Sequence, residues 1–362
     1  MDTRKIGNAV NILNFQKQCI VDLGTSRTRV MWSGSRAMFD QSSLWIPELQ
    51  LYGARAEELE GRSVQTRNIH KPVELGVISD PERAGEYLHS ILVDELKQSI
   101  PQFLASPMLS GFFFSPKGLM IVPTTATAVE RQGAILVGQL AGLRAVQVCD
   151  VAVAVSGLLE YPTALVCVLG AGMVEISLIS AGEVMFSHAL PDWTGDEIDA
   201  RIVQHLQREH HIEVTLSMAK TLKHQLATLV DQSAESSTKT PTTRSSFIVR
   251  GKDQQTGLPI SIRVESSFLA EYLLEYLKAL VDRITASLEE IPASILVEVL
   301  EQGVVIAGGG AMLPGLEMML ADRVRMPVRV LKDPDLAIIR GAHVMMKRKN
   351  DSERSGTGER TP

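Results

Sequence analysis

A strand-like pattern, a Leu-Gly turn and a second strand-like pattern occur twice in this 362-residue chain. The first copy is VDLGTSRTRV at residues 21–30 and the second is CVLGAGMVEI at residues 167–176, an offset of 146 residues (167 − 21). Each copy predicts a hairpin with a tight glycine turn. Two such hairpins about one domain apart predict two similar domains, each presenting a turn to a shared cleft. Chance similarity of two short hairpins is the alternative.

Strand and helix patterns alternate in both halves of the chain. Apolar, β-branched runs predict strands at residues 18–21, 29–32, 119–122, 164–169, 174–179, 247–249, 260–264 and 304–307. Apolar residues at helical spacing predict helices at residues 128–140, 196–207, 217–230, 268–291 and 316–324. This mixture predicts an α/β fold built from layers of sheet and helix.

The composition narrows the classes of function. The formal charge of −6, from 42 acidic and 36 basic side chains, argues against a general nucleic-acid binder, which has a basic excess. The three cysteines (Cys19, Cys149 and Cys167) lie far apart in apolar runs and indicate buried thiols in a reducing compartment. The chain shows neither the run of about 18 apolar residues that a membrane-spanning helix needs nor the apolar stretch of a signal peptide. We therefore expect a cytoplasmic protein.

The first glycine turn, residues 22–26, has the residue types that bind phosphate. It joins two strands, so it is neither a Walker loop nor a Rossmann fingerprint, both of which open a helix. Gly24 lets the backbone approach a ligand closely, and Thr25 and Ser26 add hydroxyl donors to an anion-binding nest of N–H groups. Asp22 at the strand end could hold a hydrated magnesium ion. A plain hairpin turn is the alternative.

Two further glycine segments have similar backbone freedom. The turn at residues 170–172 follows Val168, so it brings no carboxylate. Residues 304–312 predict a strand that runs into three glycines, whose backbone entropy cost suggests that something flat or charged approaches them. A nucleotide base or phosphate is one interpretation, and close packing of helix on strand is the other.

These turns belong to a larger set of motifs. In chain order the set is DLGT at 22–25, VPTTATAVER at 122–131, GAG at 170–172, GDEID at 195–199, VRGKDQQTGLP at 249–259 and GGGAM at 308–312. It resembles MreB, the bacterial actin-like protein, over residues 18–346, and the stretch 249–259 is specific to MreB and its close relatives. The resemblance implies an actin/Hsp70-like two-domain fold, in which duplicated α/β domains with smaller subdomains face an ATP cleft. It also implies membrane-attached filaments that guide cell-wall synthesis and cell shape.

Carried over by position, the resemblance implies a set of nucleotide contacts. They are Asp22, Gly24, Thr25, Ser26 and Arg27 in the first phosphate loop, Gly170, Ala171, Gly172 and Met173 in the second, Gly195 and Asp196 in the GDEID motif, Lys220, Thr221 and Lys223 at the ribose, and Gly308, Gly309, Gly310, Ala311 and Met312 in the adenosine loop. The implied cofactors are ATP or ADP and, at a weakened site, Mg²⁺ held by Asp22 through water.

The departures from the family pattern concern hydrolysis more than binding. The family has an aspartate and a threonine where this chain has Val168 and Met173, and its water-positioning Glu-Glu-Pro run matches residues 149–151 here. Asp150 in that run is the catalytic candidate, and an inert strand-end residue is the alternative. Arg27 replaces an asparagine, and pointing inward it would pair with phosphate and partly replace magnesium. We expect a nucleotide binder that is at most a weak ATPase.

The resemblance also sets the expected parts of the chain. They are domain I at 18–155 with a small subdomain at 37–80, domain II at 156–326 with a small subdomain at 193–259, and a return to domain I at 327–347. Two polar segments, a loop at 231–246 and a tail at 348–362, lack apolar periodicity and predict uncompacted surface. A docking or regulatory role for either segment is the alternative.

Two apolar segments predict attachment to the inner face of the cytoplasmic membrane. One is an amphipathic N-terminal segment, 1–17, and the other is the proline-flanked loop 111–116, which by resemblance coincides with the membrane-inserting loop of MreB. The apolar residues concerned are Ile6, Val10, Leu13, Phe112, Phe113 and Phe114. A groove filled by the phenylalanines, with a disordered N-terminus, is the alternative.

The expected partners are further copies of this chain in a filament, the membrane, envelope morphogenesis proteins and a second MreB. One competing function is a non-polymerising accessory partner of a conventional MreB. The other is a sugar or acetate kinase of the same superfamily, for which the chain shows no acceptor-substrate site.

Overall fold

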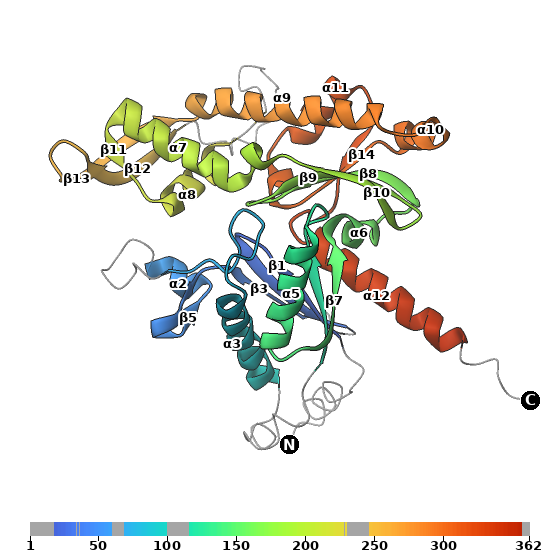
Figure 1. Ribbon diagram of the computed structural model, residues 1–362. Coiled ribbons are helices and arrows are strands. Elements are labelled where there is room, and N and C mark those ends of the chain that lie inside the picture. Colours follow the sequence, from blue (N-terminus) through green and yellow to red (C-terminus); the bar gives the residue numbers. More distant parts are fainter. Residues whose placement is uncertain are drawn as a thin grey trace, which may run out of the picture. The chain divides into compact units, whose positions relative to one another are not determined.

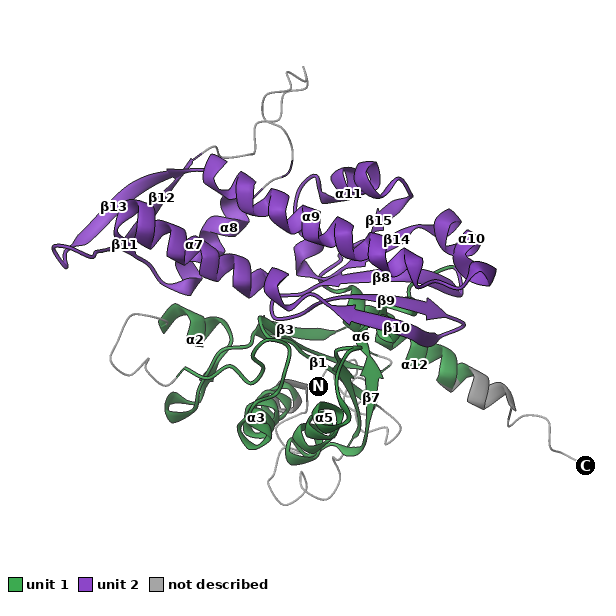
Figure 2. Cartoon of the chain, turned by 45° about the horizontal axis from the view of Figure 1, so that its top comes forward, with its two compact units in different colours: residues 1–160, 336–362 green, residues 161–335 purple. Residues whose placement is uncertain are grey.

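The computed structural model describes residues 18–33, 35, 37–59, 69–99, 116–227, 229 and 246–356. The chain divides into two compact units, and Figure 2 colours them separately: unit 1 is residues 1–160 with 336–362, and unit 2 is residues 161–335.

Unit 1 is built on a five-stranded sheet in the order β3-β2-β1-β6-β7 (Figure 1). The strands are β1 (Gln18–Leu23), β2 (Arg27–Trp32), β3 (Met38–Ser42), β6 (Lys117–Val122) and β7 (Arg144–Asp150). β2 is antiparallel to both β1 and β3, whereas β6 runs parallel to β1 and to β7. The unit therefore combines an N-terminal hairpin with a parallel half.

Both faces of this sheet are covered. Cys19 and Val21 of β1 belong to a core with α3 (Pro81–Ser99) and α5 (Ala128–Leu140). Ile20, which points to the opposite face, packs with α6 (Val151–Ser156) and α12 (Ala337–Gly356). Burial on both faces explains why residues 19–21 of β1 are consecutive apolar residues that do not alternate with polar ones. A smaller part of the unit contains β4 (Trp45–Ile46), β5 (Leu51–Tyr52) and α2 (Ala54–Leu59).

Unit 2 contains a second five-stranded sheet, in the order β10-β9-β8-β14-β15. Its strands are β8 (Thr163–Leu169), β9 (Val174–Ser180), β10 (Glu183–Ala189), β14 (Val304–Ala307) and β15 (Val328–Val330). The helices are α7 (Gly195–His210), α8 (Leu216–Leu226), α9 (Ser267–Glu289), α10 (Ala293–Gln302) and α11 (Leu316–Val324). A three-stranded sheet adds β11 (Ile212–Glu213), β12 (Ser246–Asp253) and β13 (Pro259–Glu265). The apolar stripe predicted at 268–291 is the buried face of α9, where Leu273, Leu280 and Ile284 join the core.

The two large sheets have one topology. β1, β2, β3, β6 and β7 correspond in order and direction to β8, β9, β10, β14 and β15. The register matches as well. Asp22 lies opposite Arg29 in unit 1, and Val168 lies opposite Glu175 in unit 2. Both members of the second pair follow those of the first by 146 residues (168 − 22 and 175 − 29). The two similar α/β domains predicted from the repeated hairpin are confirmed.

Some boundaries differ from the sequence prediction. The return to unit 1 was expected at residue 327, but β15 pairs with β14, so the chain leaves unit 2 only after Asp335. A three-residue edge strand carries too short an apolar pattern to be recognised. The tail expected from residue 348 is helical up to Gly356, where it continues α12.

Several predictions fall outside the described residues. These are the N-terminal segment 1–17, the loop 111–115, residues 231–245 of the polar loop and the last six residues of the tail. Within the described ranges, no helix combines the length and the apolar character that crossing a bilayer requires.

Candidate functional site

The first turn connects β1 to β2 and depends on a glycine. The Gly24 N–H donates to the carbonyl oxygen of Arg27 at 3.1 Å, and a Cβ at position 24 would lie 2.9 Å from that oxygen. Ser43, just after β3, donates its hydroxyl to the Gly24 carbonyl at 2.7 Å. The Thr25 hydroxyl accepts a hydrogen bond from the Gly76 N–H at 3.1 Å, which leaves its hydrogen as the group that a ligand could use. The turn is thus held from two sides.

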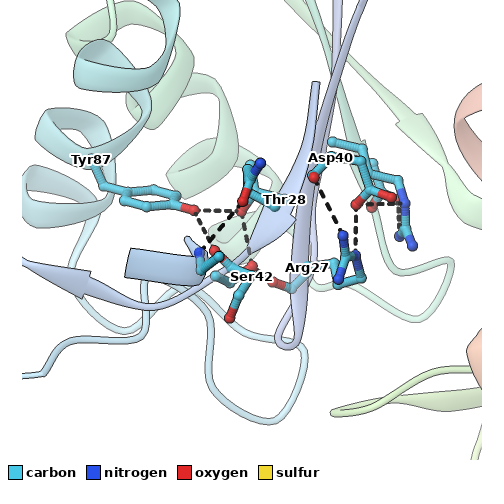
Figure 3. A network of polar contacts seen from close by, with 11 residues as sticks. Arg27, Thr28, Asp40, Ser42 and Tyr87 are labelled. Carbon is cyan, nitrogen blue, oxygen red and sulfur yellow. Dashed lines mark hydrogen bonds and ion pairs between the residues drawn. The ribbon is translucent and has the colours of Figure 1, made fainter. Parts of the chain in front are cut away.

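Two polar networks lie on opposite faces of the β1-β2-β3 hairpins (Figure 3). On one face, the Tyr87 hydroxyl donates to Thr28 at 3.0 Å, and Thr28 shares a 2.8 Å hydrogen bond with Ser43. Burial raises the pKa of Tyr87 to about 12, so the phenol stays protonated. This network ties α3 to the strands beside the turn, and through Ser43 to the turn itself.

The other face has a row of charged side chains. Arg29 lies between Asp22 on β1, at 3.7 Å, and Asp40 on β3, at 3.4 Å. Arg27 pairs with Asp40 at 2.7 Å. Burial raises the pKa of Asp22, which is 8% exposed, and the charge of Arg29 opposes that shift. Two carboxylates and two guanidinium groups therefore balance one another within unit 1.

The guanidinium of Arg27 is paired with Asp40 on the neighbouring strand and is 44% exposed. Its charge is thus offset within unit 1, and its expected contact with phosphate stays a prediction. Arg29 is the basic group beside Asp22, and the sequence analysis did not single it out. The register of a hairpin with four residues between its last paired positions, 23 and 28, could have found it, because that register sets residue 29 opposite residue 22.

Asp150, the catalytic candidate, ends β7 and is held by an ion pair with Arg131 of α5. The same guanidinium donates to the carbonyl oxygens of Ala126, at 3.1 Å, and Thr124, at 3.2 Å. Arg131 also belongs to the 122–131 motif, whose Thr127 caps α5 through a capping box with Glu130. The contacts of Asp150 are therefore structural ones, between β7 and the start of α5.

The second turn repeats the geometry of the first. The Gly170 N–H donates to the carbonyl oxygen of Met173 at 2.9 Å, and a Cβ at position 170 would clash with that oxygen. The carbonyl oxygens of Gly170 and Ala171 accept from the N–H groups of Gly195 and Asp196, at 3.1 and 2.8 Å. The turn is thereby fixed to the first residues of α7.

Lys223 of α8 lies at the same place. Its ammonium donates to the Gly195 carbonyl at 2.6 Å and pairs with Asp199 of α7 at 2.8 Å. Burial raises the pKa of Asp199, and Lys223 opposes that shift. The nearby Thr221 hydroxyl donates to the Ser217 carbonyl within its own helix at 2.9 Å. Lys223 thus links α8 to α7, whereas its expected contact with ribose stays a prediction.

The triple-glycine segment packs against the strand that leads into the second turn. Gly308 has a φ of +90°, and a Cβ there would lie 2.5 Å from the carbonyl oxygen of Leu169. A Cβ at Gly310 would lie 2.8 Å from the Leu169 side chain, whereas Gly309 has open space and Met312 is 64% exposed. Both interpretations of the segment therefore find support: close packing at Gly308 and Gly310, and accessible surface at Gly309 and Met312. Unit 2 brings together the residues expected at 170–173, 195–196, 223 and 308–312.

Glu175 of β9 is a further residue that the sequence analysis missed. It is 2% exposed and lies opposite Val168 on one side and Ala189 on the other. Its carboxylate occupies, in unit 2, the place that Arg29 has in unit 1.

The residues present do not fit the expected magnesium site. Magnesium is held through carboxylate oxygens and retained water molecules. Asp22 already faces Arg29, and the corresponding residue of unit 2, Val168, offers no oxygen. Across the described ranges, no three His, Cys, Asp or Glu side chains gather as a metal site would require.

Comparison with known proteins gives a consistent answer over almost the whole chain. The MreB/Mbl protein family model matches residues 16–354. The cell shape-determining protein Mbl of Bacillus subtilis (strain 168) is 26% identical over 343 residues, which is 92% of this chain and 96% of that protein. The crystal structure of MreB5 of Spiroplasma citri bound to ADP superimposes with a TM-score of 0.79 at 20% identity, covering 94% of this chain and 98% of that one. The MamK double helical filament gives a TM-score of 0.69 at 21% identity, with coverages of 92% and 99%.

Proposed function

The chain belongs to the MreB/Mbl family and has its actin-like fold, and from this premise we propose that it is a nucleotide-binding filament protein of bacterial cell shape with weak or absent ATP hydrolysis. In this proposal it binds ATP or ADP, polymerises along the inner face of the cytoplasmic membrane and guides cell-wall synthesis. Envelope morphogenesis proteins and a second MreB are the partners proposed for it.

The repeated glycine turn is the observation that supports nucleotide binding most strongly. In both units a glycine N–H closes the turn onto the carbonyl three residues later, and no larger residue fits at Gly24 or Gly170 without displacing that carbonyl. Such turns present successive N–H groups to an anion. The fold neighbours from Spiroplasma citri were solved with ADP and with AMPPNP. We propose that each of these turns is a phosphate-binding element and that the adenosine binds at the exposed part of residues 308–312.

Weak hydrolysis follows from what surrounds the turns. Val168 and Met173 cannot orient a phosphate or a hydrated ion, because neither side chain has a strong hydrogen-bonding atom. Asp150 is engaged by Arg131, so its carboxylate is oriented by the start of α5 and not by a water molecule at the turns. A nucleophile displaced by about 1 Å can lose about 100-fold in rate. We expect phosphate release close to background.

The test combines three measurements on the purified full-length chain. Titration with ADP measures binding, phosphate release measures turnover, and high-speed pelleting with electron microscopy measures polymerisation in each nucleotide state. The proposal expects binding, near-background turnover and filaments. Monodisperse particles in every nucleotide state would favour the non-polymerising accessory role, which the apolar second turn and the engaged Asp150 also suit.

Membrane attachment is proposed from the sequence alone. The test is co-sedimentation with anionic vesicles, comparing the parent chain with a variant in which Phe112, Phe113 and Phe114 are replaced by serine. Release of the variant, with its thermal unfolding unchanged, supports the loop as an anchor. Equal binding of the two proteins would refute it.

A further inference from the structure

Four carboxylates named above each pair with a basic side chain of the same unit. Asp22 faces Arg29 at 3.7 Å and Asp40 pairs with Arg27 at 2.7 Å. The other two pairs join Asp150 to Arg131 and Asp199 to Lys223. The folded chain itself thus supplies the positive charge that offsets these four carboxylates.

The geometry of β1 and β2 makes this compensation part of the sheet. Asp22, Arg29 and Asp40 are cross-strand neighbours in register, so their side chains lie on one face in one row. Asp22 and Arg29 are both buried, which weakens screening by water and salt. A hydrated cation drawn to Asp22 would lie close to the Arg29 guanidinium, which would repel it.

The second turn, in unit 2, lacks a carboxylate that could attract a cation. At the position that corresponds to Asp22, the chain has Val168, which adds no negative charge beside the turn. The nearest carboxylate in that row, Glu175, is 2% exposed and lies within the sheet. Residues 170–173 of the second turn therefore bring no charged side chain, and the charged groups nearest to it come from α7 and α8, where Asp196 and Lys223 lie.

Resting on the nucleotide binding proposed above, we infer that this chain binds the polyphosphate of ADP or ATP without a divalent cation. A magnesium-dependent site holds the ion between the phosphate oxygens and its carboxylates, and the ion offsets the negative charge of both. Here Asp22 is already paired with Arg29 and Val168 has no carboxylate, so the two turns offer the ion no free carboxylate and add no uncompensated negative charge. Binding energy comes from the turn N–H groups and from the contacts of the base and sugar.

The deciding experiment is a calorimetric titration of the full-length chain with ADP, once in magnesium chloride and once in EDTA at the same ionic strength. We expect the two dissociation constants to agree within about tenfold. Binding that is lost in EDTA and present in magnesium overturns the inference but leaves the proposed nucleotide binding intact. Absence of binding in both media overturns the proposed function, and the inference with it.

A charge placed at position 168 sharpens the test. Val168→Asp adds a carboxylate without a basic partner beside the second turn, and Val168→Asn is the matched variant of the same shape without the charge. We expect the aspartate variant to bind ADP at least about tenfold more weakly in EDTA than in magnesium, and the asparagine variant to bind equally in both. Equal binding of the aspartate variant in both media, with its thermal unfolding showing an intact fold, contradicts the charge argument. If this variant does not fold, the ADP titrations of the parent chain in magnesium and in EDTA still test the inference.

Discussion

The β1-β2 hairpin of unit 1 and the β8-β9 hairpin of unit 2 have the same turn, register and sheet neighbours, but their side chains differ at every position of one row. In unit 1 the row reads Asp22, Arg29 and Asp40, and in unit 2 it reads Val168, Glu175 and Ala189. What the two share is a glycine N–H closing onto the carbonyl three residues on. Backbone geometry therefore sets the hairpin, whereas the side chains of the row set the charge that a ligand would meet.

The comparison also separates two ways of stabilising a buried row. Unit 2 has only one charged side chain in it, whereas unit 1 has a chain of ion pairs whose members depend on one another. Removing one partner of a buried pair leaves the other charge uncompensated, which costs more than losing an apolar contact of the same size. Substitutions in the two units can test this difference.

Replacing Arg29 should have the largest effect on stability. Arg29→Met leaves Asp22 and Asp40 facing each other without their shared guanidinium, and we expect a loss of about 3–5 kcal/mol in the free energy of unfolding. The matched control is Arg27→Met, because Arg27 is 44% exposed and its pair with Asp40 should contribute at most about 1 kcal/mol. Denaturation with urea measures both. Equal losses would show that the row is not held by Arg29.

The shared turn can be broken in either unit. Gly170→Ala puts a Cβ against the Met173 carbonyl more tightly than Gly24→Ala puts one against Arg27, and we expect about 1–3 kcal/mol for the former and less for the latter. Gly133→Ala in α5 is the control, because a Cβ there meets nothing within 4 Å and alanine favours a helix. Thermal unfolding and ADP titration report on the fold and on the turn. A Gly170→Ala variant as stable as the control would contradict the close approach.

The raised pKa of Asp22 predicts that the free energy of unfolding depends on pH. Val168, the corresponding residue of unit 2, does not titrate and cannot contribute to this dependence. Because its pKa is higher in the folded chain than the usual 3.8, the folded state binds more protons, so this group lowers stability as the pH rises above about 4. Asp22→Asn should therefore flatten the fall in unfolding free energy between pH 4 and the folded pKa. Denaturation curves at several pH values measure the slope. An unchanged slope in the variant would assign the pH dependence to other groups, such as Asp199, whose pKa is also raised.

The smallest effect is expected at Asp150. Its pair with Arg131 is partly exposed, so Asp150→Asn should cost up to about 1 kcal/mol. Because Arg131 already engages the carboxylate, we expect phosphate release to stay at the background of the parent chain. Restoring polar groups with Val168→Asp and Met173→Thr is the contrasting variant, which should raise turnover in magnesium if the remaining geometry is suitable. A drop in turnover caused by Asp150→Asn alone would restore the catalytic role first considered for it.

Much of the architecture could be predicted from the sequence. The repeated Leu-Gly hairpin predicted two similar domains, and the helical stripe at 268–291 predicted α9, because turn residues and apolar periodicity act over a few neighbouring residues. The strand β15 and the helical end of α12 were missed, since one is too short and the other too polar to show a burial pattern. Glycine positions 24, 170 and 308 were also found, because their backbone requirement is local.

What only the tertiary structure decided is the partner of each charged side chain. The sequence presented Arg27 as a phosphate ligand, Asp150 as a catalytic carboxylate and Lys223 as a ribose contact, and the structure pairs them with Asp40, Arg131 and Asp199. Each of these partners comes from another strand or helix, and 13, 19 and 24 residues separate the members (40 − 27, 150 − 131 and 223 − 199). The buried face of a helix or strand can be predicted from the apolar residues along that one element. An ion pair, in contrast, forms only where two elements bring opposite charges within a few ångströms of each other. The chain by itself therefore determined where the turns are, and the packing of strands and helices determined what charge surrounds them.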